Sequence, residues 1–352
     1  MADIGHKETE ELIASLEKRL AKEYGQAAAE VHGKLMDYWR RYEIKDEKWR
    51  EWVASGKRTA EQYAEWQKSQ LMMGKRWADM RDTLANDLVK RNEAARKIVD
   101  GRMADAYAIN FNYATFDIER QARVSTSFTL YNHDSVERIL REHPEILPPP
   151  GKKVLKEISE GRAVRWEAGK LESVLLQGIL QGESIPNLAR RVASDLSTRD
   201  YKSAVRYART AMTSAQSAGR YDAYARAQDM GIEVEAEWSA VLDNRTRHDH
   251  RVLDGQRRKI GEPFIVGDVQ ILYPADFGGS DYKVPEDQIW NCRCTILGRV
   301  KGWKSNIRRD TSAIGNDYEA WKEGHGKSES VTKQTEISDA MRWAYYRMYR
   351  SG

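Results

Sequence analysis

Hydrophobic residues in the first 120 positions recur every three or four residues, the spacing that places them on one face of an α-helix. Three such series follow one another, and the second begins at Thr59 and continues to Leu84. Thr59 and Gln62 have the spacing of a capping box, which marks the start of a helix. Because no proline occurs before position 144, the pattern is not interrupted. We therefore predict an all-helical arm over residues 1–120.

An extended segment is predicted over residues 121–150. Residues 122–131 are β-branched and aromatic in near alternation, a composition that favours extended backbone. Four of the eight prolines follow before Gly151, and closely spaced prolines stiffen a chain in an extended form. This Pro-rich linker is the clearest domain boundary that the sequence offers.

The hydrophobic pattern becomes helical again over residues 151–230. Ser184 followed by Pro186 is typical of the first turn of one helix, and the alanine-rich residues 201–227 predict another. Gly231 is then expected to end that second helix.

The remaining pattern predicts a compact unit and a tail. Residues 232–238 alternate apolar with acidic side chains, as a half-buried strand does, so residues 231–300 are expected to contain β-structure. Polar and glycine-rich sequence then predicts a flexible tail over residues 301–352, ending in an aromatic and basic helix. The fold class is therefore predicted to be α+β, with a long N-terminal helical arm, a central helical region and a compact β-containing C-terminal domain.

Composition narrows the class of protein. A chain of 352 residues predicts two or three folding units. Its net charge of +4, from 58 basic and 54 acidic residues, does not by itself indicate a nucleic-acid binder. Two cysteines fit a reducing cytoplasm better than a disulfide-stapled secreted protein. The first residues lack the apolar core of a signal peptide, and no apolar run suggests a membrane segment.

Tryptophan is concentrated in the predicted arm, and two roles are open for it. Aromatic side chains at helical spacing usually pack helices together. A thin arm cannot bury every ring, however, so some rings could form a docking surface for a partner, as could the aromatic tail. The candidate docking residues are Trp39, Trp49, Trp52, Trp66, Trp77, Trp343 and Tyr346.

Both cysteines and two histidines fall in one short stretch. His248 and His250 are two positions apart, as are Cys292 and Cys294, and residues two apart project from the same side of a strand. Two neighbouring strands could therefore place all four side chains around a tetrahedral zinc ion. The alternative is that these residues are buried or hydrogen-bonded without a metal.

The acidic residues of this stretch are explained more simply by turns than by catalysis. Asp243 is expected to start a turn, and Asp254-Gly255 to form a tight hairpin in which glycine supplies a positive φ. Arg245 and Thr246 are predicted to pair with one of these carboxylates and to lock the fold. Because nothing marks a nucleophile or a paired general base, we do not predict an enzyme. A zinc-dependent nucleic-acid-processing or toxin-like enzyme is the alternative.

Basic residues recur through the same region and its C-terminal side. Such a patch could neutralise phosphates without reading sequence, although a solvated face balanced by nearby acids is more common. The residues are Arg245, Arg247, Arg251, Arg257, Arg258, Lys259, Lys301, Lys304, Arg308 and Arg309, with Trp303 among them.

These motifs, taken in order, resemble the phage Mu F-like head morphogenesis family, the minor capsid proteins of tailed bacteriophages. The resemblance covers about residues 170 to 300 and includes the lead-in segments 182–192 and 207–210. Ala211 and the pair Ile289-Trp290 depart from the family pattern, which often has an acidic residue and His-Pro at these places. The motif positions are Trp238, Asp243, Arg245, Thr246, Leu253, Asp254, Gly255, Asn291, Cys292, Arg293 and Cys294.

The resemblance implies a structural minor head protein that binds the portal and takes part in procapsid assembly, DNA packaging or DNA delivery. It implies the portal protein as partner, with the scaffold, the major capsid protein and non-specific DNA as further candidates. Such a protein is made in the host cytoplasm and then lies in the virion, inside the head near the portal vertex. A DNA-binding protein ejected with the genome is the alternative, and its affinity would fall steeply with salt. No cofactor is expected other than the zinc considered above.

Overall fold

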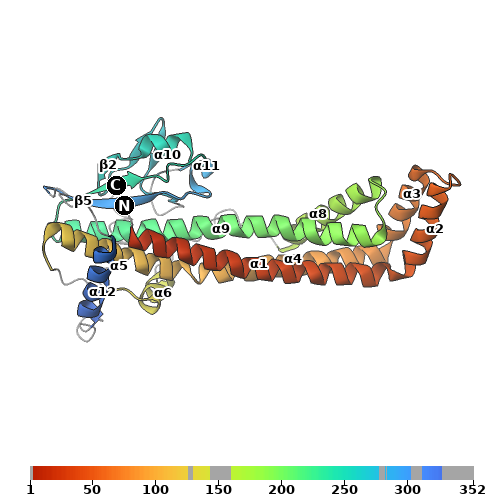
Figure 1. The fold of residues 1–352 in the computed structure, drawn as a ribbon, viewed down its shortest axis with the longest axis horizontal. Coiled ribbons are helices and arrows are strands. Elements are labelled where there is room, and N and C mark those ends of the chain that lie inside the picture. The colour runs from red at the N-terminus through yellow and green to blue at the C-terminus, as the bar shows by residue number, and fades with distance from the viewer. Residues whose placement is uncertain are drawn as a thin grey trace. The chain divides into compact units, whose positions relative to one another are not determined.

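The computed structural model describes residues 3–125, 130–142, 160–276, 282, 284–302 and 311–326. Its helices and strands are drawn in Figure 1. They form two compact units: unit 1 comprises Met1–Leu16, Val99–Lys152 and Arg206–Gly352, and unit 2 comprises Glu17–Ile98 and Lys153–Val205. The units interleave along the chain, whereas consecutive segments were expected.

The α+β prediction is confirmed, because most elements are helices and the strands form small antiparallel sheets. In chain order the helices are α1 (Ile4–Trp39), the 3-10 turn η1 (Arg40–Tyr42), α2 (Glu43–Ala54), α3 (Ala60–Leu71), α4 (Lys75–Asp100), α5 (Met103–Ala122), α6 (His133–Glu142), α8 (Glu160–Leu180), α9 (Ile185–Asp229), α10 (His248–Leu253), α11 (Glu286–Ile289) and α12 (Thr311–Gly326). The strands are β1 (Val234–Ser239), β2 (Arg257–Lys259), β3 (Phe264–Val266), β4 (Val269–Ile271) and β5 (Thr295–Val300). None of the helices in the described ranges is both long and apolar enough to cross a bilayer.

The elements of unit 2 among its described residues are all helices, joined by short turns, and α3 begins as the sequence predicts. Thr59 Oγ1 accepts a hydrogen bond from the Gln62 N–H, and Gln62 Oε1 accepts one from the Thr59 N–H, both at 3.2 Å. This reciprocal pair is the predicted capping box.

A buried carboxylate, Asp46, joins three helices of unit 2. It accepts a 2.7 Å hydrogen bond from the Tyr63 hydroxyl of α3 and a 3.3 Å bond from the Ile185 N–H at the start of α9. The first N–H groups of a helix have no partner within the helix, so a carboxylate there stabilises the end of α9. Asp46 thereby fixes α2 against α3 and against the beginning of α9.

The core of unit 2 contains two of the candidate docking tryptophans. Trp39 and Trp77 are 0% and 2% exposed, and their rings stack with centroids 6.3 Å apart. Their neighbours in the core are aliphatic residues of α1, α3, α4, α8 and α9. A docking role is therefore wrong for Trp39 and Trp77, which hold the helices together instead. Trp343 and Tyr346 lie outside the described residues.

Two predicted helix boundaries in this unit are wrong. The single helix expected from Thr59 to Leu84 is broken between α3 and α4, where Gly74 has a φ of +88° that a residue with a side chain rarely adopts. Conversely, the two helices expected between Ser184 and Ala227 are one helix, α9. No glycine or proline occurs from residue 187 to residue 218 to interrupt it.

Unit 1 contains the small sheet, in the order β2-β1-β5 with antiparallel neighbours. Val234, Ala236 and Trp238 of β1 are buried and the residues between them are partly exposed, which confirms the predicted alternating strand. The sheet is held to α5, because Gln121 donates to the Gly298 carbonyl and accepts from the Val300 N–H. Strands β3 and β4 form a separate hairpin.

Helices α5 and α9 approach closely in unit 1. A Cβ atom on Gly219 would lie 2.4 Å from the carbonyl oxygen of Tyr107, so only glycine fits there. The next residue, Arg220, is 1% exposed and pairs with Asp3 near the start of the chain. It also donates to the Asn110 side chain and to the Ile296 carbonyl. Arg220 thus connects α9 with the N-terminus, with α5 and with β5.

Two further predictions are corrected in unit 1. Helix α6 occupies part of the predicted extended segment 121–150; Asn132 caps it by accepting from the Ser135 N–H at 2.8 Å, and Val136 is fully buried. Part of the segment predicted to be a flexible tail forms helix α12. Its residue Tyr318 is buried against Tyr113 and Phe116, a contact that stabilises the helix. The proline run and the terminal helix lie outside the described residues.

Candidate functional site

Asp243 is the centre of the turn that follows β1. Its carboxylate accepts hydrogen bonds from the Arg245 N–H at 2.9 Å and from the Thr246 hydroxyl at 3.2 Å. The guanidinium of Arg293 donates to both carboxylate oxygens, at 2.7 and 2.6 Å. Such a paired contact fixes geometry as well as adding charge attraction. Asp243 therefore links the turn to the segment that leads into β5.

Arg245 pairs with Asp243 as predicted, but the ion pair is 3.7 Å long and the Arg245 side chain is 74% exposed, so the closer guanidinium contact is that of Arg293. Thr246 does contact Asp243, as expected. Asp254 serves the turn differently from the prediction: its carboxylate accepts from the Ala240 N–H at 2.7 Å. Gly255 has the predicted positive φ, +76°, but it joins α10 to β2 rather than closing a hairpin.

We expect Arg293→Ala to lower the melting temperature more than Arg245→Ala does. Arg293 holds the pKa of Asp243 well below its usual range, helped by the Arg245 N–H and the Thr246 hydroxyl. A carboxyl whose pKa is lowered by folding stabilises the protein above its ordinary value of 3.8, and that contribution disappears as the pH falls through the folded value. Thermal melts from neutral pH downward test this. The difference in melting temperature between wild type and Arg293→Ala should become smaller at acid pH. Equal melting temperatures for Arg293→Ala and Arg245→Ala would contradict the conclusion that Arg293 is the main stabilising partner of Asp243.

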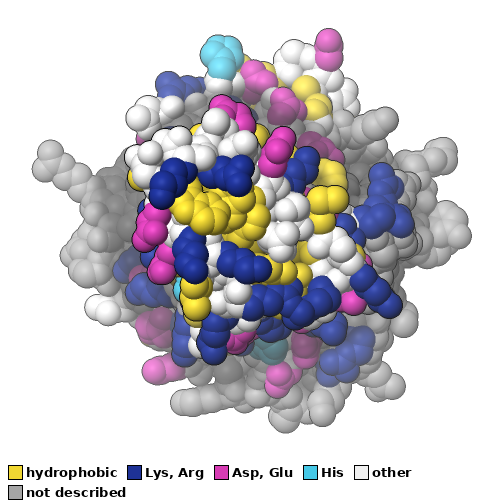
Figure 2. Space-filling model, turned by 90° about the vertical axis from the view of Figure 1, so that its right-hand side faces the viewer, with side chains coloured by type: hydrophobic (Ala, Val, Ile, Leu, Met, Phe, Trp, Pro, Cys, Tyr) yellow, Lys and Arg dark blue, Asp and Glu magenta, His cyan; other side chains and the backbone are white. Residues whose placement is uncertain are grey.

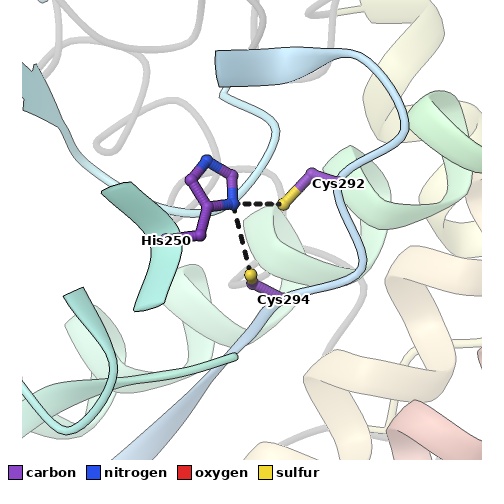
Figure 3. Close-up of side chains that lie close together, drawn as sticks. All are labelled: His250, Cys292 and Cys294. Carbon is purple, nitrogen blue, oxygen red and sulfur yellow. Dashed lines mark hydrogen bonds between the residues drawn. The ribbon is translucent and has the colours of Figure 1, made fainter. Parts of the chain in front are cut away.

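His250, Cys292 and Cys294 converge in the interior of unit 1. His250 Nδ1 lies 3.6 Å from Cys292 Sγ and 3.4 Å from Cys294 Sγ, as Figure 3 shows. All three residues are at most 2% exposed. Among the described residues they are a group whose possible ligand atoms all lie within 4.8 Å of one another. The predicted meeting of histidine and cysteine therefore occurs for three of the four residues.

His248 does not join this group. Its side chain is 88% exposed and lies 3.4 Å from the carboxylate of Asp249. The spacing of His248 and His250 predicts that they share one side of a strand, but both lie in the helix α10. On a helix, residues two apart point about 200° apart, so only one of them can face the cysteines.

The two thiols differ in their ease of ionisation. A hydrogen bond from Cys294 lowers the pKa of Cys292, against the effect of burial, and His250 acts in the same direction. The same hydrogen bond, together with burial, raises the pKa of Cys294. The arrangement thus favours one thiolate beside an imidazole and a second thiol. Soft sulfur and imidazole donors of this kind suit zinc among the common metal ions.

Comparison with known proteins identifies the region that contains these side chains. Residues 169–297 match the family model described as Phage Mu protein F like protein. They form a Mu F-like domain. The resemblance found from the motifs is confirmed, and the domain extends from α8 into β5.

Two relatives resemble larger parts of the chain. The minor head protein GP7 of Bacillus phage SPP1 is 27% identical over 230 residues, which are 63% of this chain and 70% of that protein. The NAD(+)-arginine ADP-ribosyltransferase EFV of Enterococcus faecalis is 27% identical over 198 residues, 56% of this chain. The chain spans only 38% of the length of that transferase. No solved structure matches the chain significantly.

Helix α9 anchors the Asn-Cys-Arg-Cys segment of the Mu F-like domain. The Thr210 hydroxyl accepts from the Asn291 N–H at 3.0 Å, and the Thr213 hydroxyl donates to the Cys292 carbonyl at 2.9 Å. Thr210 belongs to the lead-in segment, but sequence reasoning missed Thr213. Two threonines three positions apart in an alanine-rich helix lie on one face, and that spacing is the signal that could have identified it.

The other motif residues of the Mu F-like domain have structural roles. Trp238 is 1% exposed, and its ring packs edge-on against His250 and Phe264. Leu253 is fully buried. Asn291 has a φ of +58°, a conformation that asparagine tolerates better than most residues. Of these residues, Trp238 contacts the group formed by His250 and the two cysteines directly, through the His250 ring.

Several of the basic residues considered for DNA contact make internal interactions. Arg257 pairs with Glu237 at 2.7 Å. Arg251 donates to the Thr246 carbonyl, and Arg258 donates to the Pro263 carbonyl. These guanidinium groups therefore support the strand pairing and the turns of the Mu F-like domain. Trp303, Lys304, Arg308 and Arg309 lie outside the described residues.

Proposed function

We propose that this chain is a phage minor head protein that binds the portal protein during procapsid assembly and thereby affects DNA packaging or delivery. The Mu F-like domain and the likeness to the SPP1 minor head protein support the assembly role. The proposed portal contact is the tryptophan surface, defined as Trp49 and Trp52 of α2 with Trp66 of α3. An exposed aromatic cluster of this kind is the single observation that carries the docking assignment.

The tryptophan surface is a connected set of rings. Trp49 lies between the other two, with ring centroids 5.6 Å from Trp52 and 5.7 Å from Trp66. Trp52 is 37% exposed, and Trp49 and Trp66 are partly exposed. The guanidinium of Arg58 lies 5.5 Å from the centre of the Trp49 ring. These residues differ from Trp39 and Trp77, which are buried in the core of the same unit.

Charge adds to the case for a partner. Figure 2, seen from the side where α2 and α3 lie in Figure 1, shows hydrophobic side chains bordered by lysines and arginines. Tryptophan and arginine are the side chains most often responsible for large shares of binding energy at protein interfaces. A matching portal surface would present apolar pockets surrounded by carboxylates, since opposite charges favour correct association.

Trp52→Ala is the variant that tests this contact. A tryptophan at the centre of an interface typically contributes at least about 2 kcal/mol, so the dissociation constant should rise roughly 30-fold. The measurement is co-expression with the portal protein of the same phage, followed by size-exclusion chromatography and titration calorimetry. Trp166→Ala is the matched control, because Trp166 is also on unit 2 and is 69% exposed but belongs to α8.

Three results would count against the proposal. Equal portal affinity for Trp52→Ala and wild type would exclude the tryptophan surface as the docking site. The DNA-binding alternative would be favoured if the wild-type chain fails to bind the portal but binds DNA of any sequence, with an affinity that falls as the salt concentration rises. Transfer of label from NAD to an arginine-containing protein would favour a transferase, the activity for which the Enterococcus faecalis relative is named.

A further inference from the structure

We propose that His250, Cys292 and Cys294 bind one zinc ion in the interior of the Mu F-like domain. In a tetrahedral site with Zn–S bonds of about 2.3 Å and Zn–N bonds of about 2.0 Å, a ligand nitrogen and sulfur lie roughly 3.6 Å apart. The observed distances from His250 Nδ1 to the two sulfur atoms are 3.6 and 3.4 Å. Both nitrogen-to-sulfur distances are therefore close to the spacing that one shared ion requires, and all three donor atoms lie within 4.8 Å of one another.

Burial supports an ion rather than an accidental meeting of side chains. The three residues are 2%, 1% and 2% exposed, so water does not solvate the donors freely. His250 Nδ1 faces two sulfur atoms, although one imidazole nitrogen can donate at most one proton. Buried polar groups are normally fully paired. A metal ion satisfies Nδ1 and both sulfurs together.

The surrounding fold holds the ligands in place before an ion binds. The rings of Trp238 and His250 pack in a T-shaped arrangement, with their centroids 5.4 Å apart. Thr213 fixes the backbone of Cys292, and Arg293, between the two cysteines, is fixed by Asp243. Ligands that are held in position by neighbouring contacts lose less freedom on binding, which favours affinity.

The proposed ion has a structural role. It would connect α10, which carries His250, to the segment that enters β5, which carries both cysteines. Three side chains among the described residues supply ligands, so a water molecule would complete the tetrahedron. Three protein ligands and a water are the usual composition of catalytic zinc sites, but these donors are buried. The enclosure of the donors leaves no access for a large substrate, so the ion acts as a cross-link. This inference does not depend on portal binding.

Metal content of the full chain tests the proposal directly. The protein is purified without a polyhistidine tag from zinc-supplemented cells, and its zinc is measured by mass spectrometry. We expect about one equivalent per chain. Replacement of the ion by cobalt(II) should give thiolate-to-metal charge-transfer absorption and the intense visible bands of tetrahedral cobalt. Removal by a chelator should lower the melting temperature by roughly 5 to 10 °C, and added zinc should restore it.

The two histidines of α10 provide a matched pair of variants. His250→Ala, Cys292→Ser and Cys294→Ser should lose the zinc and the cobalt spectrum, whereas His248→Ala should keep both. Circular dichroism reports whether each variant is folded. If a variant does not fold, the chelation experiment on the wild-type chain still tests the proposal independently. A folded wild-type chain that takes up neither zinc nor cobalt would overturn the proposal. So would full zinc content in His250→Ala.

Discussion

Replacing Arg220 with methionine should lower the free energy of unfolding by about 3 to 5 kcal/mol, because it leaves a buried carboxylate without its partner. Arg220 is 1% exposed, and the side chain of its partner Asp3 is 10% exposed. Burial alone would raise the pKa of Asp3, but the Arg220 guanidinium more than offsets burial, and the pKa lies below its ordinary value. Thermal and urea unfolding of Arg220→Met measure the loss.

Two controls separate the buried charge from a general effect of losing an arginine. Arg190→Met changes an exposed arginine on the same helix and should alter the free energy of unfolding by less than about 0.5 kcal/mol. The double variant Arg220→Met with Asp3→Leu removes both charges and should recover part of the loss. If Arg220→Met and Arg190→Met unfold at the same temperature, the pair between α9 and the N-terminus does not stabilise the protein.

Gly219→Ala should destabilise the protein by about 1 to 3 kcal/mol, the range found when extra atoms are forced into a packed core. The new Cβ atom would lie 2.4 Å from the Tyr107 carbonyl oxygen and 3.2 Å from the Phe111 nitrogen. Both are backbone atoms of α5, which cannot move aside as a flexible side chain can. Helices α5 and α9 would have to separate, and urea unfolding would record the cost.

Gly169→Ala is the matched control for that prediction. Gly169 also lies in a helix, α8, but an added Cβ atom there meets no atom within 4 Å. Alanine is the better helix former, so this substitution should stabilise the protein by up to about 1 kcal/mol. A loss of stability in Gly219→Ala together with a gain in Gly169→Ala would locate the destabilising effect in the contact between α5 and α9. Stabilisation by both substitutions would show that the contact can relax.

The elements that the sequence predicted correctly depend on local chemistry. The capping box of Thr59 and Gln62, the alternation of β1 and the helix stop at Gly231 are each decided within a few residues. Helix ends were less predictable. Nothing in the polar residues between Val192 and Tyr201 favours helix strongly, yet α9 continues through them because its packing on other helices outweighs local preference.

The errors at the candidate site have a common physical origin. The sequence suggests Arg245 as a partner of Asp243 or Asp254, but it does not reveal Arg293, which makes the shorter contacts with Asp243 from 50 residues away in the sequence. A pairing at that separation depends on how β1 and β5 meet, which periodicity does not reveal. The choice between His248 and His250 likewise depended on whether α10 is a strand or a helix.

The pairing of Arg220 with Asp3 also bears on how the protein folds during synthesis. The two residues are 217 positions apart. At about 5 to 20 residues per second, Asp3 leaves the ribosome roughly 10 to 40 s before Arg220 is made. During that interval the apolar side chains of Leu12 and Ile13, buried in the finished protein, lack the part of unit 1 that begins at Arg206. The beginning of the chain is therefore a natural substrate for chaperones until α9 has been translated.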